Sequence, residues 1–261
     1  MIGLTKQLQE RSIFAIKRKI SVVTTAFTVA LFLPFVLYAL FHFGILAGKS
    51  PFDSDIQEPV AKVITGTGTG TAFLISSTTL LTARHIVEDK QVGDQVDLLF
   101  EHSKKQLQVK ATIKYITPAS EQSVGGLTSI DYFLTDVAVL VVSEITDIEP
   151  LLLGESNTVQ NLDEVILIGY PNGDYSITKG NINSDTYQGV NLFKLDATAN
   201  PGNSGGPCIL KDDNTVIGIL VGSSATAQQG ENIALKIDGE YHSVKTMYEP
   251  CLSYPGLNLS K

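Results

Sequence analysis

Residues 200–207 read NPGNSGGP, and this is the most informative stretch of the chain. The glycines around Ser204 allow a sharp turn that exposes the serine hydroxyl. Such a turn also aims successive backbone N–H groups into one concavity, which can hold a developing oxyanion. An ordinary tight turn rich in Gly, Asn and Pro is the alternative. The stretch therefore predicts a nucleophilic serine, which needs a base and a carboxylate from elsewhere in the chain.

The sequence around this turn indicates an all-β body. From Pro59 onward, short β-branched runs alternate with Gly, Asn, Asp and Pro, which favours an antiparallel sandwich or a pair of barrels. A connecting stretch at about 143–162 divides the strands into two halves. The expected strands cover 60–64, 71–75, 96–100, 107–115, 137–142, 165–169, 191–196, 216–221 and 233–237. Only the end, 244–261, has apolar residues at helical spacing.

His85 is the best placed of the four histidines to act as the base. It ends the run LLTARH, residues 80–85, at a strand-to-turn junction that can present a side chain to a cleft. Taken alone, His85 also fits an ordinary surface residue.

Asp136 is the carboxylate expected to orient the base. It enters the apolar run 137–142, where burying a carboxylate is costly unless it is paired. A strand-end cap facing water is the alternative reading, and Asp131 is a rival for the role. The chain order His85, Asp136, Ser204 is that of chymotrypsin, and it differs from the orders of subtilisin and the α/β-hydrolases.

Six segments, in order over roughly residues 60–240, resemble trypsin-like serine proteases, and specifically the HtrA/Deg branch. They are TAFLI (71–75), LTARHIV (81–87), TDVAVL (135–140), LLGES (152–156), VILIGYP (165–171) and DATANPGNSGGP (196–207). The resemblance implies two six-stranded antiparallel β-barrels of the chymotrypsin type, with the active site in the cleft between them.

The resemblance also implies a role for each candidate residue. His85 would be the general base, Asp136 its orienting partner and Ser204 the nucleophile. The N–H groups of Gly202 and Ser204 would form the oxyanion hole, with that of Asn203 close by. The substrate pocket would be walled by Thr198, Ala199, Asn200, Val221, Gly222 and Ser223. Because none of these is charged, the pocket is expected to prefer small-to-medium apolar side chains to Arg or Lys.

Two departures from relatives bear on control. Secreted digestive proteases carry an aspartate before the nucleophile, which pairs with a new N-terminus after cleavage, and here Asn203 stands in its place. Activation by such a cut is therefore not expected. The chain ends about 20 residues after the last expected strand, so a PDZ domain like that of many HtrA proteins is not expected either. Control would then depend on the loops 172–174, 198–201 and 223–230, and assembly into a homo-oligomer stays open.

An uncharged stretch, residues 20–46, is long enough to span a bilayer as one transmembrane helix. Three basic residues at 17–19 place the N-terminus in the cytoplasm and the protease domain outside it, in the periplasm if the source is bacterial. A cleaved signal peptide is the alternative, although its apolar region usually runs about 7–15 residues. The expected organisation is a cytoplasmic segment, the span, a linker, two barrels, and a C-terminal helix with its tail: 1–19, 20–46, 47–59, 60–149, 150–243 and 244–261.

Charge and cysteine content exclude several classes of function. Residues 1–50 carry a net charge of +5 and residues 51–261 one of −13, so the acidic body would repel a nucleic acid backbone. Two cysteines and four histidines leave little material for a zinc site, and no metal or cofactor is expected. Cys208 and Cys251 could form a disulfide in an oxidising compartment, or remain two buried thiols.

Together these observations predict a membrane-anchored serine endopeptidase that cleaves polypeptide substrates through an acyl-enzyme. A catalytically silent protease fold that serves as a binding or scaffold protein is the alternative from another class. A hydrolase of small esters is a second alternative.

Overall fold

The computed structural model describes residues 55–66, 68–118, 123–124, 127–128, 130–223 and 231–237. The expected transmembrane span (20–46) and the expected C-terminal helix (244–261) lie outside these residues. Within the described part of the chain, no helix is both long and apolar enough to cross a membrane.

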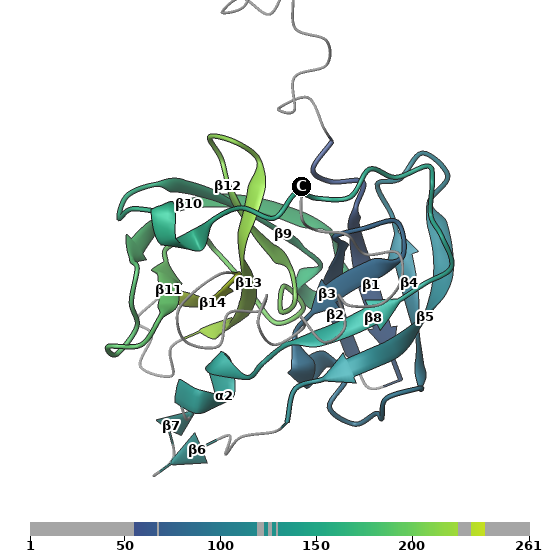
Figure 1. Cartoon of the computed structure of the whole chain (residues 1–261), viewed down its shortest axis with the longest axis horizontal. Coiled ribbons are helices and arrows are strands. Elements are labelled where there is room, and N and C mark those ends of the chain that lie inside the picture. The colour runs from purple at the N-terminus through teal and green to yellow at the C-terminus, as the bar shows by residue number, and fades with distance from the viewer. Residues whose placement is uncertain are drawn as a thin grey trace, which may run out of the picture. The chain divides into compact units, whose positions relative to one another are not determined.

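Two closed six-stranded barrels form the body, as the resemblance implied (Figure 1). The first contains, in spatial order, β1 (Val60–Thr65), β2 (Gly68–Leu74), β3 (Thr79–Thr82), β8 (Ala138–Val141), β5 (Leu107–Ile116) and β4 (Gln95–Phe100). The second contains β10 (Ser176–Ser184), β11 (Leu192–Leu195), β14 (Asn232–Lys236), β13 (Thr215–Ser223), β12 (Pro207–Leu210) and β9 (Glu164–Gly169). All the paired strands are antiparallel. Barrel closure leaves neither sheet with free edges.

Three barrel strands, β3, β12 and β10, lie outside the β-branched runs of the sequence, although a strand was expected before His85 and another just after the nucleophile turn. Each has a local reason. β3 has four residues, all buried, and it ends just before His85. β12 follows directly on the glycine turn and is equally short. β10 carries polar residues on a face that the barrel leaves partly exposed, so it lacks the β-branched run by which the other strands were recognised.

Short elements between the strands place residues at the rim of the barrels. The 3₁₀ turn Arg84–Ile86 follows β3, and the helix α2 (Ile130–Leu134) precedes β8. The 3₁₀ turn Pro171–Gly173 follows β9. A further 3₁₀ turn covers Ser156–Thr158, and β6 (Ser123–Val124) pairs with β7 (Leu127–Thr128) in a small two-stranded sheet.

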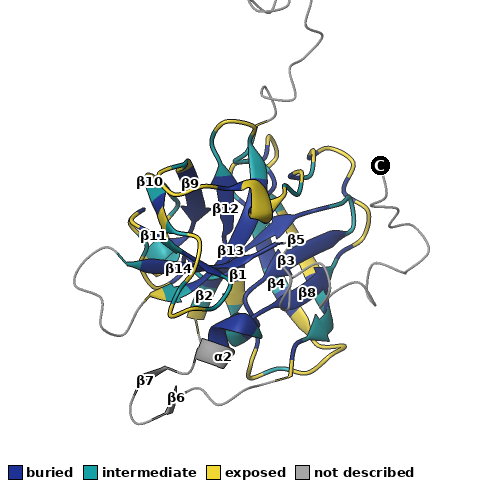
Figure 2. Ribbon diagram, turned by 60° about the vertical axis from the view of Figure 1, so that its left-hand side comes forward, coloured by how far each residue is buried: buried dark blue, intermediate teal, exposed yellow. Residues whose placement is uncertain are grey.

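Buried apolar residues form one cluster inside each barrel and a third cluster where the barrels meet (Figure 2). The third cluster joins Phe73 and Leu81 of the first barrel to Ile168 and Tyr170 of the second. Backbone hydrogen bonding continues across this interface, since the N–H of Thr71 donates to the carbonyl oxygen of Ser204 at 2.9 Å. The packed interface therefore fixes the glycine turn against the first barrel.

Candidate active site

His85 and Asp136 contact each other at the rim of the first barrel. The carboxylate of Asp136 is fully buried, and its Oδ2 lies 2.6 Å from Nδ1 of His85. Its Oδ1 accepts the backbone N–H of His85 at 2.9 Å. A buried carboxylate is thus satisfied by two donors of one residue. Because a carboxylate only accepts, Nδ1 carries the proton, which leaves Nε2 of His85 as an acceptor.

Asp136, the carboxylate expected beside His85, is therefore the residue that contacts its imidazole. Asp136 lies between α2 and β8, where the backbone enters the buried strand. The rival, Asp131, is on α2, and its side chain lies outside the description.

The turn that carries Ser204 requires glycine at 202 and 205, and also at 206, where a Cβ would lie 2.5 Å from the carbonyl oxygen of Ile168. Gly202 and Gly205 have φ angles of +106° and +82°, a region that favours glycine. A Cβ on Gly202 would collide with the carbonyl oxygen of Tyr170, and one on Gly205 with that of Thr71. The glycines of NPGNSGGP are thus explained by conformation and by close backbone approach.

Two N–H groups of this turn remain free to bind a ligand. Within the described residues, the backbone N–H groups of Gly202 and Ser204 donate no hydrogen bond. The N–H of Asn203, expected close to the oxyanion hole, instead donates to the carbonyl oxygen of Asn200 at 3.0 Å. Gly202 and Ser204 are therefore the two donors available to an oxyanion.

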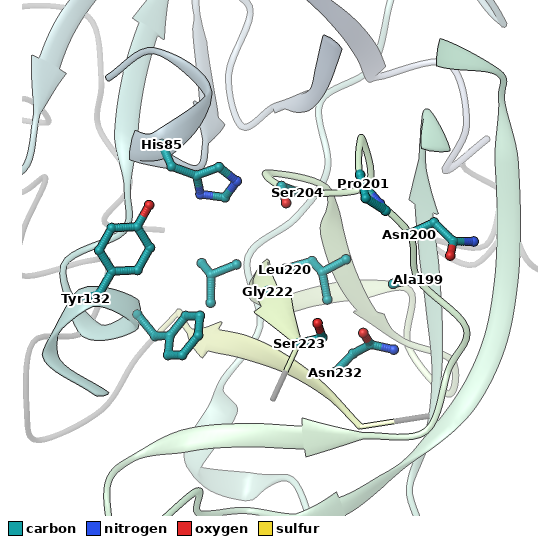
Figure 3. A pocket seen from close by; sticks show the side chains of 12 residues that line it. His85, Tyr132, Ala199, Asn200, Pro201, Ser204, Leu220, Gly222, Ser223 and Asn232 are labelled. Atoms are coloured by element: carbon teal, nitrogen blue, oxygen red, sulfur yellow. The ribbon is translucent and has the colours of Figure 1, made fainter. Parts of the chain in front are cut away.

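His85 and Ser204 line one pocket of about 300 Å³ (Figure 3). Ala199, Asn200, Val221, Gly222 and Ser223, all expected in the pocket wall, line it as well. Thr198 does not: its side chain is exposed, and its carbonyl oxygen accepts the hydroxyl of Thr178 at 2.8 Å. The pocket thus has His85 from the first barrel and Ser204 from the second in its lining, together with five of the six residues expected in its wall.

Four lining residues were not predicted from the sequence, Tyr132, Phe133, Pro201 and Asn232, whereas Leu220 begins the strand 220–224 that was expected in the pocket wall. The most informative is Asn232, which is buried at the start of β14 opposite Ser223. Its Nδ2 donates to the carbonyl oxygen of Ala197 at 2.6 Å, which fixes the amide orientation. Its Oδ1 accepts no hydrogen bond from the described residues. Asn232 directly precedes the apolar run 233–237, and a polar residue in that position was the one sequence feature that could have indicated its role.

Arg84, next to His85 in sequence, is unexpectedly buried, with 4% of its surface exposed. Its guanidinium lies over the ring of Tyr132, 4.6 Å from the centroid, and its Nη1 lies 3.9 Å from Glu88. Nε and Nη2 are buried and have no hydrogen-bond partner among the residues that the structure describes. Burial, followed by the charges of Asp136 and Glu88, raises the pKa of Tyr132, so its phenol stays neutral beside His85.

Cys208 is a free and fully buried thiol on β12, and Cys251 lies outside the described residues. Burial raises the pKa of Cys208 to about 12, so the thiol stays protonated and unreactive. Among the described residues, no group of three or more His, Cys, Asp or Glu side chains could hold a metal ion.

Known proteins resemble this chain in sequence and in fold. The family model of the trypsin-like peptidase domain matches residues 70–219, more than half of the chain. The putative serine protease HhoB of Synechocystis sp. is 32% identical over 194 residues, which cover 69% of this chain and 40% of HhoB. The magnetosome formation protease MamE of Paramagnetospirillum magneticum is 42% identical over 92 residues, which cover 32% of this chain and 12% of MamE. The chain thus spans less than half the length of these curated relatives.

A solved structure of the HtrA-type protease AlgW with a tripeptide has the same fold, with a TM-score of 0.56 at 23% identity. The match covers 76% of this chain and 60% of AlgW. Both the family match and the fold cover the segments that hold His85, Asp136 and Ser204. The chain belongs to the family of trypsin-like peptidase domains.

Proposed function

We propose that this chain is a serine endopeptidase that cleaves polypeptides through an acyl-enzyme, with Ser204 as nucleophile, His85 as general base and Asp136 as its orienting partner. One observation carries the proposal. The imidazole that is fixed by Asp136 at 2.6 Å lines the same pocket as Ser204, beside two N–H groups that have no hydrogen-bond partner within the described part of the chain.

Each group has a step in the proposed reaction. Nε2 of His85 takes the proton of the Ser204 hydroxyl as its Oγ attacks the carbonyl carbon of the peptide bond. The negative charge that develops on the carbonyl oxygen is stabilised by the N–H groups of Gly202 and Ser204. The imidazolium, stabilised by Asp136, then gives its proton to the leaving amine, and the C–N bond breaks. Water attacks the ester by the same route and releases Ser204.

The pocket chemistry indicates which substrates fit. None of the residues that line the pocket is an Asp, Glu, Lys or Arg. An Arg or Lys side chain before the cleaved bond would therefore lack a countercharge. Leu220, Val221 and Phe133 supply apolar wall, whereas Asn232 and Ser223 supply hydrogen-bonding groups. Small-to-medium uncharged side chains therefore fit the pocket best.

Anchoring and location form the second part of the proposal. The uncharged stretch 20–46, with basic residues before it, is proposed as a single membrane anchor that leaves the barrels outside the cytoplasm. Protease added to the outer face of sealed membranes should then digest the body and leave a short protected fragment. Digestion of the body only from the cytoplasmic face would contradict this orientation.

The test of the activity uses the full chain in detergent with a library of uncharged peptides. Wild type should cleave internal peptide bonds, and Ser204→Ala should not, while a matched Ser184→Ala variant at the distant end of β10 should cleave like wild type. Failure of wild type to cleave, with no acylation of Ser204, would instead indicate a silent binding protein. Cleavage of esters but not of peptides would indicate a small-ester hydrolase.

A further inference from the structure

The peptide bond between Pro201 and Gly202 determines where the Gly202 N–H points. The carbonyl oxygen of Pro201 accepts the N–H of Asn172 at 2.8 Å. In a trans peptide the C=O and N–H point in opposite directions. Anchoring this carbonyl to the turn Pro171–Gly173 therefore directs the Gly202 N–H away from the turn. Rotation of the peptide would remove one of the two donors proposed for the oxyanion.

The turn that provides this anchor has an unusual backbone. Asn172 and Gly173 have φ angles of +54° and +89°, and a non-glycine residue adopts the first only at some cost. The turn closes on itself by a bond from the N–H of Gly173 to the carbonyl oxygen of Tyr170 at 3.0 Å. A conformation of this kind persists only when its surroundings hold it.

Lys62 of the first barrel holds the turn from outside. From β1 it reaches across 111 residues of sequence, and its Nζ donates to the carbonyl oxygen of Gly173 at 2.7 Å. The Lys62 side chain is only 16% exposed, and its Nζ lies 3.7 Å from Oε1 of Glu101 and 5.2 Å from the ring centroid of Tyr170. A hydrogen bond from a charged donor in a partly buried site is among the stronger ones.

The other end of the turn is also held by the first barrel. The ring of His102 lies against that of Tyr175 in a tilted arrangement, with centroids 3.7 Å apart, and the Tyr175 hydroxyl donates to Oε1 of Gln57 at 2.9 Å. The segment 170–175 is thus clamped on both sides by residues that precede the second barrel. The cation at Lys62 is the part of this clamp that directly contacts the carbonyl next to Asn172.

We propose that Lys62 is a positioning residue for the oxyanion hole: its bond to the Gly173 carbonyl holds the turn, and through the Asn172 N–H and the Pro201 carbonyl it directs the Gly202 N–H into the pocket. This inference rests on the proposed function for its effect on rate, but the coupling itself is a property of the fold. It links the first barrel to a backbone group of the second through two hydrogen bonds: Lys62 Nζ to the Gly173 carbonyl oxygen at 2.7 Å, and the Asn172 N–H to the Pro201 carbonyl oxygen at 2.8 Å.

The test compares Lys62→Met, which keeps the aliphatic stem and removes the donors, with Lys62→Arg, which keeps a charged donor. Lys110→Met is the matched control, because Lys110 is an exposed lysine of the same barrel that pairs only with Asp97 among the described residues. In the full chain, Lys62→Met should lower kcat about 10- to 100-fold, less than the 10²–10³-fold typical for deletion of an oxyanion donor, and change KM less than about 2-fold. Lys62→Arg should recover most of kcat, and Lys110→Met should match wild type.

Hydrogen exchange provides a readout that does not need activity. The Asn172 amide should exchange at least about 10-fold faster in Lys62→Met than in wild type, with no change at Asp136 or in the strands of the first barrel. Unchanged exchange at Asn172, or equal losses in kcat/KM and in global stability without a kcat-specific effect, would overturn the proposal. An inactive wild type with faster exchange in Lys62→Met would contradict the proposed function and leave the coupling standing.

Discussion

The first barrel brings to the pocket the ring of His85, held by the carboxylate of Asp136, whereas the second barrel brings the Ser204 hydroxyl, a wall of side chains and the backbone N–H groups of the glycine turn. On the second barrel the N–H groups of Gly202 and Ser204 are directed by turns whose glycines cannot carry a Cβ. Side-chain chemistry in the first barrel depends on one hydrogen bond between the imidazole of His85 and the buried carboxylate of Asp136. Backbone chemistry in the second depends on close approach of whole chain segments, some of them from the first barrel.

Because of this difference, a substitution in each barrel should disturb the structure over a different range. The two hydrogen bonds of the buried Asp136 carboxylate both go to His85, so the interaction is local. Its loss should leave the rest of the first barrel intact. The glycine turn is a long-range device, since the carbonyl oxygens of Ser204 and Gly202 bond to the backbone N–H and the hydroxyl of Thr71. Its loss should disturb both barrels.

Removing the catalytic side chain that each barrel contributes should give the largest losses of activity. Ser204→Ala and His85→Ala should each lower kcat by roughly 10⁴-fold or more, about 5.4 kcal/mol of barrier, and the double variant should lose little more. Peptide hydrolysis by the purified full chain measures this. Additive losses in the double variant would show that the two side chains act independently.

Gly205→Ala should affect stability where the side-chain variants do not. An alanine Cβ there meets the carbonyl oxygen of Thr71 and, at 2.7 Å, the backbone nitrogen of Ala83, at a φ of +82°. Overpacking and backbone strain together should cost about 3 kcal/mol of unfolding free energy. Gly66→Ala is the control, since a Cβ at Gly66 meets nothing within 4 Å. Equal denaturation midpoints for the two variants would mean that the turn is not held by the first barrel.

Asn232→Val should change the choice of substrate with a smaller effect on rate. Removing the free Oδ1 should lower kcat/KM about 10-fold for peptides with Ser or Thr before the cleaved bond, and leave those with Ala or Val nearly unchanged. Asn161→Val, at an exposed position on the same barrel, should keep the wild-type preference. A uniform loss across all four peptides would assign Asn232 to folding and not to selection.

The smallest effect on activity is expected at Cys208, inside the second barrel. Because burial raises its pKa from 9.0 to about 12, the native thiol should resist alkylation at pH 8 and the treated protein should keep its activity. The folded state holds this proton more tightly than the unfolded state, so the contribution to stability is complete below about pH 9 and is lost as pH rises toward 12. Mass spectrometry of a Cys251→Ser variant measures the labelling. Rapid native labelling at pH 8 would show that β12 is accessible.

The parts of the site that could be predicted from sequence lie in short, self-explanatory segments. In the turn 200–207 the glycines themselves indicate a left-handed backbone. The apolar run after Asp136 indicates that its carboxylate is buried and must therefore have a hydrogen-bond partner. The two barrels followed from strand spacing together with the family resemblance. Their closure and order agree with that expectation.

The parts that could not be predicted depend on register and on remote packing. The pairing of Asn232 with Ser223 follows an irregularity between Leu220 and Gly222 of β13, and a shift of one residue would turn every side chain to the other face. The sequence does not indicate that Arg84 is buried, because its burial depends on the ring of Tyr132 from α2. Lys62 likewise contacts a turn 111 residues away, which no local pattern indicates.

Acylation of Ser204 tests the central claim most directly. The full chain would be treated with a serine-directed fluorophosphonate, digested, and mapped by mass spectrometry, with His85→Ala and heat-unfolded wild type as controls. We expect one adduct, on the peptide that contains Ser204, formed by native wild type and reduced by roughly 10³-fold or more in rate in both controls. No adduct on Ser204 in the native chain, or an adduct that forms equally fast without His85, would contradict the claim.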